Sequence, residues 1–216
     1  MRTLVATMSL VVCMAVYATP STLVSIPSTD IQPKGIYHLG SDVYLPVDGS
    51  GAATSDIGLT YGLDPRVEVG IDNFSGTVDP LTFNAKVLIT PIGSKVPVAV
   101  GISNLALKKD SAWDQSMAYI VGSYVTDAGP RLTFGGYTSN KNVVGSPKDG
   151  ILLGADYQLG KWWYGVDYIS GENGLGTVNP GVGYNFADNV GVILGYDKYN
   201  SGAFKDTYNL QVDINF

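Results

Sequence analysis

Five aspartates share one placement along the chain, and together they could form a ring of negative charge. Each lies on the polar side of a stretch in which polar and apolar residues alternate, and each lies towards the same end of its stretch. The five are Asp42, Asp56, Asp72, Asp167 and Asp197. Carboxylates that line an opening attract cations and repel anions. The chemistry that they suggest is selection among ions.

Glu68 and Lys86 are opposite charges on two neighbouring alternating stretches. Counted about the loop at residues 75–79, they fall nearly opposite each other and on the same polar face. We therefore expect a cross-strand ion pair inside the fold. Its default role is structural, because a charge that faces a confined interior needs a partner. A role as a charged constriction stays open as an alternative.

Residues for catalysis are scarce. His38 is the only histidine and Cys13 the only cysteine, so no metal-spaced cluster can form from these residue types. There is no GxSxG element and no glycine loop that precedes a helix to hold phosphate. We predict neither an enzyme nor a cofactor or metal site, and we read His38 as a hydrogen-bonding residue of the interior. An outer-membrane hydrolase is the remote alternative.

The elements that must carry these side chains are β-strands, because apolar and polar residues alternate along most of the chain after Pro33. The count is about twelve, between ten and fourteen. The expected ranges are 35–44, 56–63, 66–72, 81–90, 96–103, 117–125, 131–137, 151–158, 162–168, 178–186, 190–197 and 208–216. Such a run of strands predicts an all-β fold, a transmembrane antiparallel up-and-down β-barrel.

The connections and the aromatic residues separate a membrane barrel from a secreted soluble β domain, which would also alternate. Short and long connections follow one another in turn, as the two ends of a membrane barrel require. Aromatic side chains flank the Val, Leu and Ile positions near both ends of the apolar face, which is typical of membrane interfaces. The membrane barrel is therefore favoured, and the soluble domain is the alternative.

The last nine residues, YNLQVDINF, alternate without interruption and end in an aromatic residue. The apolar face consists of Tyr208, Leu210, Val212, Ile214 and Phe216. This strand resembles the C-terminal signal by which Gram-negative outer-membrane β-barrel proteins are recognised for insertion. The segments GLTYGLDPRVEVGID, FNAK and GYDKYN also resemble an uncharacterised group of small bacterial outer-membrane barrels. The resemblance implies a porin-like barrel and the cell outer membrane, but no established activity.

The first 18 residues are expected to be a cleaved signal peptide, with Arg2 before an apolar run and Val16-Tyr17-Ala18 before the cut. Residues 19–33, rich in Ser, Thr and Pro, predict a periplasmic lead-in; a short segment that enters the pore is the less favoured alternative. Residues 34–216 would form the barrel domain. Cleavage would also remove Cys13.

The net charge of −6 and the absence of a basic run argue against nucleic-acid binding. The function that we predict is a narrow passive porin-like channel for ions or small polar solutes. A non-conducting structural or surface-interaction barrel is the alternative, in which the aspartates would be solvated rim charges or would bridge divalent cations to lipopolysaccharide. The expected partners are outer-membrane lipid, lipopolysaccharide and the barrel-assembly machinery.

Overall fold

The structure is a computed structural model, and it describes residues 21–75, 81–106 and 115–216. Cys13 and the signal peptide expected at residues 1–18 lie outside the described residues. Parts of the predicted loops at 75–79 and 105–115 also lie outside them.

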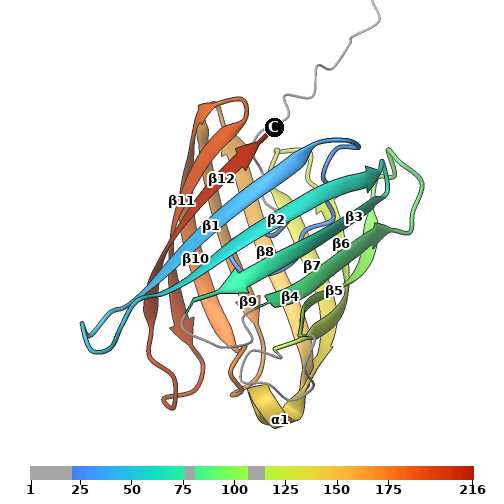
Figure 1. Ribbon diagram of the computed structural model, residues 1–216. Coiled ribbons are helices and arrows are strands. Elements are labelled where there is room, and N and C mark those ends of the chain that lie inside the picture. The colour runs from blue at the N-terminus through green and yellow to red at the C-terminus, as the bar shows by residue number, and fades with distance from the viewer. Residues whose placement is uncertain (1–20, 76–80, 107–114) are drawn as a thin grey trace, which may run out of the picture.

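Twelve antiparallel strands form one closed barrel in which every strand pairs with its neighbours in sequence and β1 pairs with β12 (Figure 1). The strands are β1 (Tyr37–Pro46), β2 (Thr54–Asp64), β3 (Val67–Phe74), β4 (Leu81–Leu88), β5 (Val98–Ala106), β6 (Met117–Val125), β7 (Arg131–Ser139), β8 (Asp149–Leu159), β9 (Trp162–Ile169), β10 (Thr177–Ala187), β11 (Val190–Tyr199) and β12 (Thr207–Asn215). The predicted all-β up-and-down barrel of about twelve strands is confirmed. Strand ends differ from the predicted ranges by a few residues, because alternation continues into the turns.

The alternating side chains sort to the two faces of the barrel wall. On β12 the polar residues Asn209, Gln211 and Asp213 are buried, whereas Tyr208 and Leu210 are exposed. Large apolar side chains are exposed on other strands in the same way. Examples are Ile57, Val69, Ile71, Ile120, Phe134, Ile151 and Leu194. The wall is therefore apolar outside and polar inside, the reverse of a soluble barrel.

Aromatic side chains gather near both ends of this apolar outer face. At the short-turn end Tyr37 packs against Tyr61 and Phe216, with ring centroids 4.6 Å and 5.8 Å apart. At the long-loop end Tyr196 packs against Tyr208 at 5.6 Å. The two groups bracket the apolar band, an arrangement that membrane interfaces favour.

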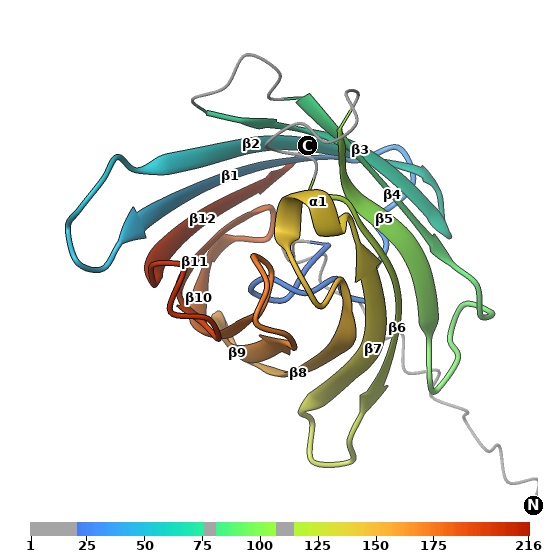
Figure 2. The same ribbon diagram turned by 90° about the horizontal axis from the view of Figure 1, so that it is seen from below.

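Residues 21–34 lie inside the barrel, and we call them the inner segment. Figure 2, which looks in from the long-loop end, shows this blue segment crossing the space within the ring of strands. Leu23, Val24 and Ile26 are 0–2% exposed. This differs from the periplasmic lead-in predicted at residues 19–33 and corresponds to the less favoured alternative, a segment that enters the pore.

The inner segment begins as a tight hairpin. Thr22 and Pro27 form an antiparallel bridge, Ser28 N donates to Ser21 O at 2.9 Å, and Leu23 N donates to Ile26 O at 2.8 Å. The chain then runs to the short-turn end, where Gly35 N donates to Gly62 O at 2.8 Å and β1 begins. The hairpin therefore points into the barrel from that end.

The long connections lie at the opposite end, beside a short helix, α1 (Lys141–Val144). Asn173, in the connection between β9 and β10, is buried and donates to the hydroxyl of Tyr137 at 3.0 Å. Across residues 21–75, 81–106 and 115–216, helices of the length and apolarity needed to cross a membrane are absent.

Candidate functional site

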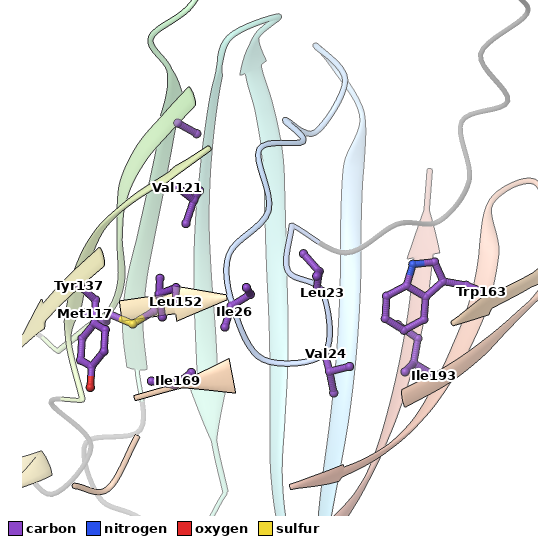
Figure 3. Close-up of a cluster of buried hydrophobic side chains, with 11 residues drawn as sticks. Leu23, Val24, Ile26, Met117, Val121, Tyr137, Leu152, Trp163, Ile169 and Ile193 are labelled. Carbon is purple, nitrogen blue, oxygen red and sulfur yellow. The ribbon is translucent and has the colours of Figure 1, made fainter. Parts of the chain in front are cut away.

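The inner segment divides the interior of the barrel into a packed half and an open half. On the packed side, the three apolar residues of the hairpin meet side chains from the wall (Figure 3). The cluster comprises Leu23, Val24, Ile26, Ala99, Met117, Val121, Tyr137, Leu152, Trp163, Ile169 and Ile193. This core lies within a barrel whose outer face is also apolar. The hairpin therefore fills one side of the lumen with apolar side chains.

Asp167 holds the tip of the hairpin. Its Oδ2 accepts hydrogen bonds from the backbone amides of Val24, Ser25 and Ile26 at 2.8, 2.8 and 3.2 Å. Its Oδ1 accepts from Nδ2 of Asn179 at 2.6 Å. Asp167 is 1% exposed, so this carboxylate is solvated by amides in place of water. The prediction that placed Asp167 in an open vestibule is corrected: its side chain is covered by the inner segment.

The open half contains a cavity of about 400 Å³. It extends from the level of His38 and Glu68 to strand ends at the long-loop rim, where Thr54 and Thr207 line it. A cavity of this size holds many water molecules or a small solute. At its inner end, residues 21, 22, 24, 25 and 27 of the hairpin form part of the lining.

Three of the predicted aspartates face this cavity from neighbouring strands. Asp42 on β1 lies directly opposite Asp56 on β2, and Asp72 on β3 lies opposite Gly58 of β2. Oδ1 of Asp56 is buried and has no hydrogen-bond partner among the described residues. Asp72 accepts a hydrogen bond from Nδ2 of Asn84. The structure thus brings Asp42, Asp56 and Asp72 together on one side of the cavity.

Asp197, the fifth predicted aspartate, lines the same cavity but is only 4% exposed. Its carboxylate accepts from Thr207 Oγ1 at 2.8 Å and from Asn209 Nδ2 at 2.6 Å. It is therefore more enclosed than Asp42, Asp56 and Asp72. The ring predicted from the sequence is, in the structure, an arc of three carboxylates, and Asp197 lines the cavity from β11 in a more enclosed position.

Glu68 and Lys86 are register partners on β3 and β4, and Lys86 Nζ lies 3.0 Å from Glu68 Oε1. Both side chains are almost fully buried. The inner segment uses the remaining atoms of the pair, because Gln32 N donates to Glu68 Oε2 at 2.6 Å and Lys86 Nζ donates to Ser21 O at 2.9 Å. The pair therefore connects the wall to both arms of the inner segment.

His38 closes the short-turn end of the cavity in a polar network. Its Nε2 lies 3.2 Å from Asp213 Oδ1, and its Nδ1 lies 3.0 Å from Asn215 Oδ1. Asn215 Oδ1 also accepts from Gln32 Nε2 at 3.1 Å. His38 therefore binds hydrogen-bond partners in the interior.

Arg131 anchors the other side of the inner segment. Its Nε and Nη2 donate to the two carboxylate oxygens of Asp156 at 2.8 and 3.1 Å, while Nη1 pairs with Asp30. Nearby, the hydroxyls of Thr29 and Ser123 lie 2.5 Å apart. Residues 29–34 are thus held to the wall by side chains near the short-turn end.

Glycines on the inner face make room for the inner segment, a role that sequence reasoning missed. A Cβ built at Gly154 would lie 2.7 Å from Leu23 and 2.9 Å from Ile26, and one built at Gly181 would lie 2.8 Å from Val24. A Cβ at Gly62 would lie 2.1 Å from the carbonyl oxygen of Pro33. In the sequence, alternation places these glycines on the inner face, where they are compatible with open space in a pore and also with tight strand curvature. Read together with apolar residues in the segment 19–33, they could have indicated what fills the pore.

The arrangement offers carboxylates around a polar cavity. Within the described ranges, no three His, Cys, Asp or Glu side chains converge as a metal site. What this site can do chemically is to attract cations and to solvate small polar molecules.

Two solved structures share this fold. One is described as KdgM porin, with 12% sequence identity, a TM-score of 0.53, and coverage of 84% of this chain and 99% of that chain. The other is the outer membrane protein Omp33 of Acinetobacter baumannii, with 12% identity, a TM-score of 0.52, and coverage of 83% and 97%. No protein-family model and no curated protein matches the sequence. The chain therefore has the barrel fold that these two outer-membrane proteins adopt along nearly their whole length.

Proposed function

We propose that the protein is a narrow porin-like channel of the outer membrane, which passes small cations and small polar solutes by diffusion. The observation that carries this proposal is the polar cavity of about 400 Å³ inside a closed barrel whose outer face is apolar. Passive passage needs no reaction, and the proposal assigns none.

Membrane placement is supported by the outer surface. Exposed side chains such as Ile57 (55%), Ile120 (50%) and Leu194 (54%) would form a continuous apolar surface far larger than soluble monomers tolerate. In hydrocarbon the same surface is favourable, and closure of the barrel satisfies every strand edge. The partners that follow are outer-membrane lipid around the apolar band, lipopolysaccharide near the long loops, and the assembly machinery that would read β12. Export with cleavage after Ala18 belongs to the same proposal.

Cation preference is supported by the arc of Asp42, Asp56 and Asp72. Their carboxylates face the cavity from adjacent strands, and none of the three forms an ion pair with a basic side chain of the described residues. A hydrated cation that enters from the long-loop end would therefore meet charge that the wall does not neutralise. Anions would meet repulsion along the same path.

The test is single-channel recording with the mature chain, residues 19–216, refolded into planar bilayers. We expect discrete conductance steps and a reversal potential of cation-selective sign in a salt gradient. The control is the same preparation left unfolded. Gel electrophoresis identifies it, because it migrates at the position of heat-denatured protein. If neither the full mature chain nor a variant without residues 19–33 conducts at any salt concentration, the protein is a non-conducting structural barrel and not a channel.

A further inference from the structure

We propose that residues 21–28 are a displaceable plug, which seats on Asp167 when the channel is closed and leaves the packed side of the lumen when it conducts. The inference rests on the proposed channel function and adds how that channel opens. It starts from the position of the hairpin, which lies within the ring of strands (Figure 2) and forms part of the lining of the cavity.

The hairpin is a unit that can move without breaking the wall. Its own backbone bonds, Ser28 N to Ser21 O and Leu23 N to Ile26 O, travel with it. The barrel is already closed by the pairing of β1 with β12 and β2, so no strand ladder depends on residues 21–28. Departure would therefore break side-chain contacts and leave the sheet intact.

The polar contacts of the hairpin can be exchanged for water. They include the three amides on Asp167, the bond from the Ser25 side chain to Asp197, the bond from Gln211 Nε2 to Val24 O at 2.8 Å, and the bond from Lys86 Nζ to Ser21 O. Because the cavity borders the hairpin, water can reach each wall group as the hairpin leaves. The buried apolar side chains of Leu23 and Ile26 oppose departure and favour the seated state. Exchange of the polar contacts for water permits departure, and apolar burial opposes it. The hairpin is therefore a two-state element in which the seated, closed state is the more populated.

The part that moves is bounded by a fixed anchor. Asp30 is paired with Arg131, and Lys34 forms a bridge with Gly62. Gly35, with φ of +83°, then turns the chain into β1. On the other side, cleavage after Ala18 would leave a free end close to Ser21. Residues 21–28 could thus swing out while residues 29–34 stay attached to the wall.

A reversible disulfide tests the inference in the full mature chain. A Cβ at Gly181 would lie 2.8 Å from Cγ2 of Val24, so cysteines at both positions would place their Cβ atoms near the distance of about 3.5–4.5 Å that a disulfide needs. Val24→Cys with Gly181→Cys would lock the tip to β10. We expect oxidation to reduce openings by roughly tenfold or more, and a reductant to restore them. The controls are the two single variants, whose conductance should not respond to reductant.

The outcomes separate this inference from the channel function. Equal conductance of the double variant before and after reduction, with the disulfide verified by mass spectrometry, would overturn displacement and leave the channel in place. Conductance only after deletion of residues 19–33, with the full chain silent in both redox states, would also overturn it, because the hairpin would then be a fixed closure. Absence of conductance in every variant would contradict the proposed channel function itself. Heat-modifiable gel mobility verifies that each variant is folded.

Discussion

Oδ2 of Asp167 and the backbone nitrogen of Val24 lie 2.8 Å apart, although 143 positions of sequence separate the two residues. The carboxylate is on the wall at β9, and the amide is on the tip of the inner segment. A buried carboxylate that accepts several amide hydrogen bonds is stable without a cation. This contact joins the part of the chain that forms the barrel to the part that fills it.

The first prediction concerns Asp167→Asn. Asparagine offers one acceptor oxygen and no charge, so it cannot satisfy the three hairpin amides and Asn179 as the carboxylate does. Hydrogen bonds to a charged group contribute ~2 kcal/mol, which corresponds to a roughly 30-fold rise in the open population. Hydrogen exchange by NMR should show the amides of Val24 and Ser25 exchanging faster by about that factor, and open probability should rise.

Asp72→Asn is the matched control for that variant. It makes the same chemical change on the opposite side of the lumen, where Asp72 accepts from Asn84 and contacts the cavity. Exchange of the Val24 and Ser25 amides should stay at the wild-type rate. Equal protection of these amides in wild type and Asp167→Asn would show that Asp167 does not hold the tip.

The second prediction concerns the buried ion pair. Glu68→Gln leaves the Lys86 ammonium, 2% exposed, with the carbonyl of Ser21 as its hydrogen-bond acceptor and without a countercharge. Breaking one side of a buried pair destabilises by about 3–5 kcal/mol, whereas replacing both charges is far milder. We expect Glu68→Gln with Lys86→Met to be more stable than Glu68→Gln alone. Urea unfolding of the wild type, Glu68→Gln, Lys86→Met and the double variant in lipid vesicles gives the coupling energy. If the losses of unfolding free energy in the two single variants add up to the loss in the double variant, the pair does not stabilise the protein.

The strands and this ion pair could be predicted from the sequence, because side chains of a β-strand alternate with a period of two. Counting about the loop at residues 75–79 placed Glu68 nearly opposite Lys86, and alternation placed Asp42, Asp56 and Asp72 on the inner face. The inner segment has no such period: Leu23, Val24 and Ile26 are apolar neighbours among Ser, Thr and Pro. Its position depends on contacts with distant residues such as Asp167, and local pattern carries no information about these. For the same reason Asp167 could be assigned to the inner face but not to its partner.

The third prediction concerns ion selectivity. A cation that lies about 4 Å from one carboxylate of the arc is attracted by ~1 kcal/mol in water, which corresponds to about a fivefold preference. Replacing all three with asparagine should lower the ratio of cation to anion permeability by roughly five- to tenfold at low salt. Reversal potentials in a salt gradient measure that ratio.

The control for selectivity removes the same charge elsewhere. Asp64, Asp127 and Asp188 do not line the cavity; Asp64 is the last residue of β2, and Asp127 and Asp188 belong to turns at the same short-turn end. Their replacement with asparagine should leave the reversal potential near the wild-type value. If both triple variants shift it equally, the net charge of the barrel and not the arc would set selectivity.

The fourth prediction concerns Phe216, whose backbone exchanges two hydrogen bonds of 2.9 Å with Tyr37 and whose ring stacks on that tyrosine at 5.8 Å. Phe216→Ala keeps both backbone bonds and removes the ring that the assembly machinery would read. We expect the refolded variant to form the barrel in detergent, while its assembled yield in the outer membrane of cells falls to a small fraction of wild type. Tyr37→Ala is the control, because it removes the same ring contact and leaves the C-terminal residue in place. Similar yields of the two variants in cells would indicate that the ring acts through packing at the β1–β12 seam and not through recognition.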